Sequence, residues 1–91
     1  MRAITATPSF QRDVKKLPRE ILDRADLAIQ TLRAEDPAPN LDIKKLRLSG
    51  RPLFRVRVGD YRLVYSFDGD SLLLLAFRHR KDVYKGLERF L

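Results

Sequence analysis

The chain has 91 residues, enough for a single domain over residues 1–91, close to the size at which one hydrophobic core suffices without staples. It has no cysteine and one histidine, which excludes disulfides, thiolate metal sites and multi-histidine metal sites, and which fits a cytoplasmic protein. A net charge of +7 favours an acidic partner such as nucleic acid, while the longest apolar run is too short to cross a membrane.

The first third of the chain predicts a strand followed by two helices. Residues 2–7 alternate weakly and predict a first strand. Thr7 and Pro8 are typical of a helix N-cap and first helical position, and Pro18 separates the two helices. The helices carry apolar stripes that a sheet would cover, formed by Phe10, Val14 and Leu17 and then by Ile21, Ala25, Ala28, Ile29 and Leu32.

The stretch 53–65, LFRVRVGDYRLVY, predicts two strands joined by a tight turn at residues 59–60. A two-residue turn places Arg57 opposite Arg62 and brings Arg55 to the same face, while apolar side chains share the other face. Like charges that face each other across a ladder are destabilising. This arginine face therefore predicts binding of a polyanion.

The remaining segments complete an α+β fold. Residues 43–48 predict a short basic strand or an extended arm, and residues 72–77, apolar on both faces, suit a central strand. Residues 68–69, Asp-Gly, are a second turn signal, and Asp82 can cap a short C-terminal helix. We expect an N-terminal helical hairpin packed on a three- or four-stranded antiparallel sheet.

A second cationic group follows the last expected strand. Because that strand runs antiparallel to the strand of Arg62, its carboxyl end lies near residues 59–60, so two basic groups distant in sequence converge at one end of the sheet. The second group consists of Arg78, His79, Arg80 and Lys81, with Tyr84 one helical turn beyond.

These residue types suit RNA chemistry. The sequence lacks a P-loop, GxGxxG, GxSxG and HExxH, and we expect no metal and no cofactor. Arginines can grip a phosphate and stabilise the charge of its transition state, a tyrosine can stack on a base or carry a proton, and a histidine titrates near neutrality. Cleavage would then use the 2′-hydroxyl of the RNA as nucleophile and spare DNA.

The motif GDYRLVY, followed by a short apolar strand and RHRKDVY, resembles the RelE/ParE superfamily of bacterial toxin–antitoxin toxins over nearly the whole chain. The RelE branch implies a ribosome-dependent endoribonuclease that cuts mRNA in the A site. The ParE branch implies the alternative, a DNA gyrase inhibitor without nuclease activity. Either implies a cognate antitoxin, and contact with operator DNA only through the antitoxin complex. A basic sheet also suits an acidic, partly disordered partner that folds on binding.

The resemblance implies roles for individual residues. Arg62 matches a phosphate-binding arginine of the family. Arg78 matches an arginine that is implicated in stabilising the transition state or the leaving group. Tyr84 matches a tyrosine that stacks on the nucleotide or takes part in proton transfer. Arg55 and Arg57 fall where RelE-like relatives place two basic residues, often lysines. Because arginine is a poor general base, Tyr84 or His79 would have to supply that function. The other residues expected to bind RNA are Arg55, Arg51, Lys44, Lys45, Arg47, Arg80 and Lys81.

Overall fold

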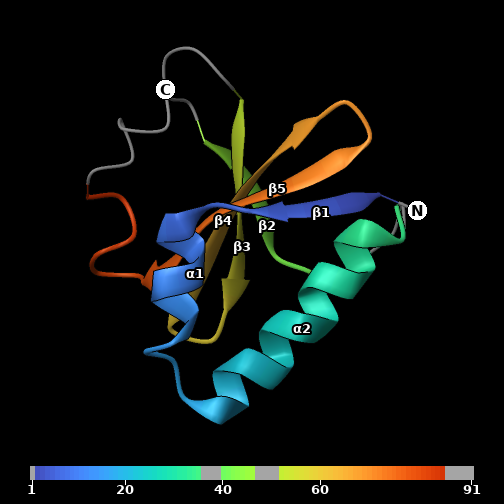
Figure 1. Ribbon diagram of the computed structural model, residues 1–91. Helices are drawn as coiled ribbons and strands as arrows, with labels where there is room; N and C mark the ends of the chain where they lie inside the picture. The colour runs from blue at the N-terminus through green and yellow to red at the C-terminus, as the bar shows by residue number, and fades with distance from the viewer. Residues whose placement is uncertain (1, 36–39, 47–51, 86–91) are drawn as a thin grey trace.

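The computed structural model describes residues 2–35, 40–46 and 52–85 (Figure 1). Both of its helices lie on the same side of one mixed sheet of five strands, whose order is β1-β5-β4-β3-β2. No helix in this part of the chain is long and apolar enough to span a membrane. The elements in chain order are β1 (Ala3–Ala6), α1 (Pro8–Val14), α2 (Arg19–Arg33), β2 (Ile43–Leu46), β3 (Leu53–Val58), β4 (Tyr61–Asp68) and β5 (Ser71–His79).

The helical hairpin has the expected start and the expected buried faces. Thr7 is the N-cap of α1, where its Oγ1 accepts a hydrogen bond from the amide of Phe10 at 3.1 Å. Phe10, Ala25 and Leu32 are buried against the sheet. The apolar stripes predicted from the sequence therefore fix which side of the helices faces the core.

The expected α+β class is confirmed, but the expected antiparallel sheet of three or four strands is wrong. β1 pairs in parallel with β5, from Ala3 opposite Ser71 to Ala6 opposite Leu74. The amide of Thr7 then donates to the carbonyl of Leu74 at 3.0 Å, so the chain enters α1 while it is still attached to β5. The chain between the two strands, from α1 through β4, is long enough for this parallel pairing, which a short hairpin could not produce.

The central hairpin has the predicted register. Arg57 lies opposite Arg62, and Arg55 lies opposite Val64. Gly59 opens the turn with φ of 61°, a conformation that glycine adopts without steric cost. The side-chain alternation expected for β3 and β4 is therefore present.

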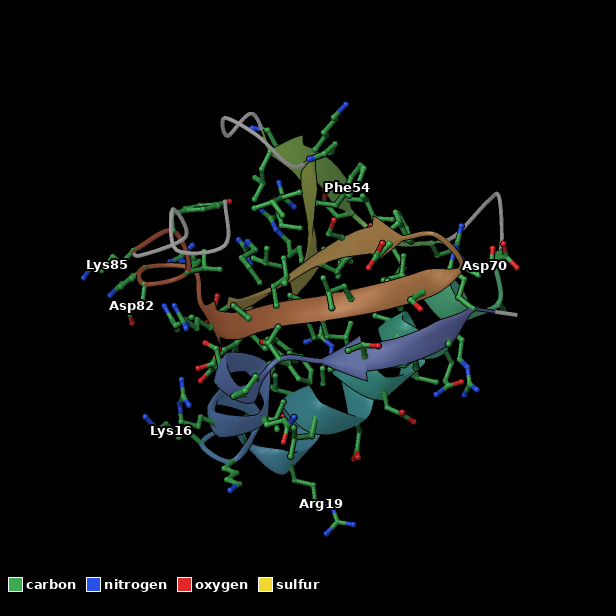
Figure 2. The ribbon with its side chains drawn as sticks, turned by 45° about the horizontal axis from the view of Figure 1, so that its top comes forward. Lys16, Arg19, Phe54, Asp70, Asp82 and Lys85 are labelled. Carbon is green, nitrogen blue, oxygen red and sulfur yellow. The ribbon has the colours of Figure 1, made fainter. Side chains whose placement is uncertain are left out.

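The sheet buries apolar side chains on both faces. The helix-covered face holds the larger cluster, which includes Val56, Leu63 and Phe77. The opposite face holds a smaller cluster formed by Leu53, Val64, Leu75, Ala76 and Val83. Val83 belongs to residues 80–85, which form turns after β5. Figure 2 shows Asp82 and Lys85, from the same segment, at the end of the sheet away from Asp70.

The expected C-terminal helix is not present in residues 80–85, which are turns. The rest of that expected helix, residues 86–91, lies outside the described residues, and so do Arg47 and Arg51.

Candidate functional site

Three neighbouring strands place arginines in one row at the end of the sheet. Arg57 of β3 lies opposite Arg62 of β4, which lies opposite Arg78 of β5. The amide of Arg80 donates to the carbonyl of Asp60 at 2.8 Å and ties the turn after β5 to the β3–β4 turn. The predicted convergence of the two basic groups is therefore confirmed for the backbone.

Arg62 is held by the turn that precedes it. Its Nη1 donates to the carbonyl of Gly59 at 3.0 Å and to that of Tyr61 at 2.9 Å, and the residue is only 7% exposed. No other atom of its guanidinium has a hydrogen bond to the residues that the structure describes. The turn therefore fixes one corner of the guanidinium and leaves Nε and Nη2 available to a ligand.

The surroundings of Arg62 favour an anion. Burial lowers the pKa of Arg62 from its ordinary value, and Arg57, Arg55 and Arg80 lower it further, while Tyr84 acts in the opposite direction. Each of these arginine effects disfavours the cation. The negative charge of a phosphate placed here would offset both the desolvation of Arg62 and the repulsion from the neighbouring arginines.

Tyr84 is presented beside this arginine by the turns of residues 80–85. Val83 is fully buried in the smaller cluster, and its amide donates to the carbonyl of His79 at 3.0 Å. Tyr84, the next residue, is 51% exposed and lies within electrostatic reach of Arg62. An exposed aromatic ring close to a buried cation is suited to stack on a base or to carry a proton to the phosphate.

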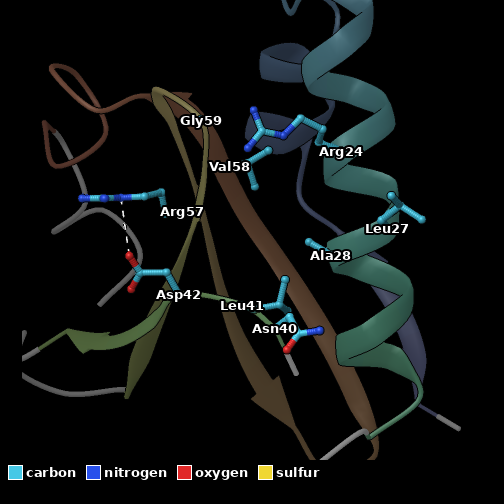
Figure 3. A pocket seen from close by; sticks show the side chains of 9 residues that line it. All are labelled: Arg24, Leu27, Ala28, Asn40, Leu41, Asp42, Arg57, Val58 and Gly59. Atoms are coloured by element: carbon cyan, nitrogen blue, oxygen red, sulfur yellow. Dashed lines mark ion pairs between the residues drawn. The ribbon is translucent and has the colours of Figure 1, made fainter. Parts of the chain in front are cut away.

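Asp42 is a member of the site that sequence reasoning missed. Its Oδ1 lies 3.4 Å from Nη1 of Arg55. Its Oδ2 lies 3.5 Å from Nε of Arg57, an ion pair that is drawn in Figure 3. Its carbonyl accepts from the amide of Arg57 at 3.0 Å, just beyond the β2–β3 ladder. Extending the β2–β3 pairing by one residue, from Ile43 opposite Val56 to Asp42 opposite Arg57, would have predicted this contact.

Arg57 also borders a groove of about 370 Å³ between α2 and β3, which Figure 3 shows from close by. Both apolar and charged side chains line the groove. Its lining consists of Arg24, Leu27, Ala28, Asn40, Leu41, Asp42, Arg57, Val58 and Gly59.

Arg78 belongs to the row by its backbone, but its guanidinium points to α1. Nε donates to Oδ2 of Asp13 at 3.0 Å, and Nη2 donates to Oγ of Ser9 at 2.7 Å. Nη1 makes a longer contact, 3.4 Å, with the carbonyl of Lys85. Arg78 therefore links α1 to the segment that carries Tyr84, and no local pattern in the sequence indicated these partners.

His79 lies on the helix-covered face of the sheet, away from Arg62. It packs edge-on against Tyr61 with ring centroids 5.5 Å apart, and its Nδ1 accepts from the amide of Lys81 at 3.1 Å. It lines a pocket of about 320 Å³ together with Asp13 and other residues of the α1 side. The structure therefore does not bring His79 together with Arg62 and Tyr84.

The remaining residues expected to bind RNA do not all lie on the same face of the sheet as Arg57 and Arg62. Lys44 pairs with Arg55 and shares its face, whereas Lys45 pairs with Phe54 and faces the other side. Lys44, Lys45, Arg80 and Lys81 are all exposed.

The chain is similar to known toxins. Residues 4–84 match the family model described as the ParE toxin of type II toxin–antitoxin system, parDE. Toxin RelE3 of Methanocaldococcus jannaschii is 32% identical over 78 residues, which cover 84% of this chain and 88% of the relative. A chain of the RelB-RelE antitoxin-toxin complex from Methanococcus jannaschii is 29% identical and superposes with a TM-score of 0.75, covering 90% of this chain and 96% of that chain. YafQ from E. coli strain BL21(DE3) shares the fold, with a TM-score of 0.77 at 18% identity and coverage of 92% and 99%.

Proposed function

The chain belongs to the RelE/ParE superfamily of toxins from type II toxin–antitoxin systems, and on that premise we propose that it is a ribosome-dependent endoribonuclease that cuts mRNA in the A site and so inhibits translation. The observation that carries the proposal is Arg62, buried, anchored at one corner and surrounded by other cations beside the exposed Tyr84. This arrangement fits a phosphate whose negative charge increases during a reaction.

The proposed reaction is metal-independent transesterification. The 2′-hydroxyl oxygen of the RNA attacks the adjacent phosphorus and loses its proton, the bond from phosphorus to the 5′-oxygen breaks, and the leaving 5′-oxygen takes up a proton. The products are a 2′,3′-cyclic phosphate and a 5′-hydroxyl. Nε and Nη2 of Arg62 bind the non-bridging oxygens and stabilise the additional charge of the transition state. Arg57 adds a second positive charge on the same face.

Tyr84 and Arg78 have different parts in this proposal. Tyr84 stacks on the base at the cleavage site or moves a proton at the reacting oxygens, whereas His79 lies on the opposite face and is not assigned a role. Arg78 is a positioning residue, because its guanidinium bonds Asp13 and Ser9 rather than facing Arg62. Lys44, Arg55, Arg80 and Lys81 attract the RNA backbone.

We also propose a cognate antitoxin as a partner, because a related toxin chain was solved as a RelB-RelE complex. An acidic chain that is partly disordered when free would complement the arginine face and cover it. Contact with operator DNA would then come through the antitoxin complex.

Primer extension on mRNA in a purified ribosome complex tests the proposed function. The parent protein is expected to produce A-site cuts, and Arg62→Ala is expected to abolish them. Arg19→Ala, which removes an exposed arginine at the start of α2, serves as a charge-matched control that keeps cutting. Uncut mRNA in the presence of folded parent protein would contradict the proposal.

The second candidate is inhibition of DNA gyrase, which the ParE description of the matching family model favours. A supercoiling assay with the same purified protein separates the two functions. Gyrase inhibition without mRNA cutting would select this candidate and would leave the arginine face as a docking surface.

A further inference from the structure

A carboxylate occupies the part of the arginine face next to Arg62. The two oxygens of Asp42 face two different arginines, with Oδ1 3.4 Å from Arg55 Nη1 and Oδ2 3.5 Å from Arg57 Nε. The two non-bridging oxygens of a phosphodiester carry the same charge and can bind two such donors in the same way. Asp42 therefore resembles an RNA phosphate both in charge and in the donors that it contacts.

The fit of the carboxylate is incomplete. Its ion-pair distances exceed the roughly 2.7–2.9 Å of strong charge-assisted hydrogen bonds. Nε of Arg55 is buried and has no hydrogen-bond partner within the described part of the chain. The side chains of Arg57 and Asp42 are 55% and 54% exposed, so water competes for their pairing. Two arginines thus share one loosely bound carboxylate, and a better acceptor would be favoured in its place.

Asp42 can leave without unfolding the sheet. Its carbonyl accepts from the amide of Arg57 at 3.0 Å and from Nη1 of Arg55 at 3.2 Å, and both bonds hold the backbone in place. Rotation about χ1 moves only the carboxylate away from the arginines. The cost is therefore limited to two weak ion pairs and one side-chain rotamer.

We propose that Arg55 and Arg57 form a phosphate subsite for an RNA chain bound at Arg62, and that the Asp42 carboxylate occupies this subsite in the free protein and is displaced by the RNA backbone. The identity of the polyanion rests on the proposed function, whereas the displacement does not. Asp42 then acts as a specificity-determining residue. A chain whose phosphates reach Arg62 and the subsite together displaces it, whereas a single free anion competes poorly.

Binding of an oligonucleotide that cannot be cut tests the displacement. The probe is a fluorescent single-stranded 2′-O-methyl RNA, titrated by anisotropy at fixed salt with no ribosome present. Asp42→Asn is expected to tighten binding about fivefold, since both ion pairs are long, at 3.4 and 3.5 Å, and the Asp42 side chain that makes them is 54% exposed. Asp70→Asn makes the same change of charge at the other end of the sheet (Figure 2) and is expected to change the Kd less than about twofold.

Every other outcome counts against the subsite. Equal tightening by both variants would mean that only net charge matters. Weaker binding by Asp42→Asn, in protein with unchanged circular dichroism, would mean that the carboxylate organises the arginines for binding. Absence of binding by every variant would also overturn the proposal. Because the probe cannot be cleaved, tightening by Asp42→Asn alongside a failed primer-extension assay would uphold the subsite and reject the nuclease function.

Discussion

Replacing Asp13 with alanine removes two hydrogen bonds that join α1 to the part of β5 beyond its pairing with β1. Oδ2 of Asp13 accepts from Nε of Arg78 at 3.0 Å and from the amide of Phe77, also at 3.0 Å. Phe77 is only 1% exposed, so its unpaired amide costs about 1–3 kcal/mol. The side chains of Arg78 and Asp13 are 27% and 15% exposed, which places their ion pair between the surface and buried cases, at about 1–2 kcal/mol.

Asp13→Ala is therefore expected to lower the free energy of unfolding by about 3 kcal/mol. A domain of this size has a total stability of about 5–14 kcal/mol, so the variant remains folded. Urea unfolding followed by circular dichroism measures the loss. Asp23→Ala removes an exposed carboxylate from α2 and is expected to change the same quantity by less than about 0.5 kcal/mol.

The double variant Asp13→Ala/Arg78→Met tests whether the two side chains act as a pair. Their coupling energy is expected to reach about 1 kcal/mol. A loss below about 1 kcal/mol for Asp13→Ala, or strict additivity in the double variant, would refute the reasoning.

The single variants Asp13→Ala and Arg78→Ala distinguish a positioning role of Arg78 from direct contact with the phosphate. If Arg78 acts by holding α1 against the end of β5, Asp13→Ala and Arg78→Ala slow cleavage to a similar extent. If Arg78 touches the reacting phosphate, Arg78→Ala alone slows cleavage by about 10²-fold or more.

Three further changes have defined outcomes. Arg62→Lys is expected to lower the single-turnover cleavage rate at least ~100-fold and to change the free energy of unfolding by less than ~1.5 kcal/mol. The reason is that a lysine ammonium cannot bond the turn carbonyls and bind a phosphate at the same time. A variant that keeps a tenth of the parent rate would contradict this. Val83→Ala is expected to lower the free energy of unfolding by about 1–2 kcal/mol in urea and also to slow cleavage. Val56→Ala, at a residue buried on the other face of the sheet, is expected to lower the free energy of unfolding as much without slowing cleavage. Equal effects of the two variants on cleavage would count against the positioning of Tyr84 by Val83. Burial raises the pKa of Tyr65 from 10.0 to about 12. As the pH rises, the phenol therefore loses its proton in the unfolded chain before it does so in the folded protein. The stability that the neutral phenol contributes is complete below pH 10 and is lost as the pH rises to about 12. Urea unfolding at about pH 9 and pH 11 should show this loss in the parent and less of it in Tyr65→Phe, and an equal loss in both would contradict it.

The sequence predicts the parts of the fold that local patterns determine. The Gly59-Asp60 turn and the alternation around it fix the β3–β4 register, and Thr7 with Pro8 fixes the start of α1. The parallel pairing of β1 with β5 joins residues 3–6 to residues 71–74. No turn or periodicity encodes a pairing between segments so distant in sequence, and the strand count was therefore underestimated.

In the candidate site, too, local patterns predict some features, whereas contacts between residues distant in sequence are not predictable. Arg57 and Arg62 share a row because a two-residue turn requires it. The direction of the Arg78 guanidinium depends on Asp13, 65 residues away, which the sequence pattern does not reveal. The position of His79 was predictable, because β5 continues through Arg78 and neighbouring residues of a strand point to opposite faces.

The most direct test of the proposed mechanism is single-turnover cleavage of an mRNA that carries one 2′-deoxynucleotide immediately 5′ of the A-site cut, in a purified ribosome complex. The proposed mechanism predicts that the all-ribose mRNA is cut to a 2′,3′-cyclic phosphate and a 5′-hydroxyl, and that the deoxy-substituted mRNA remains intact. Equal cutting of both, or no cutting of the all-ribose mRNA by folded protein, would contradict cleavage through the 2′-hydroxyl at Arg62.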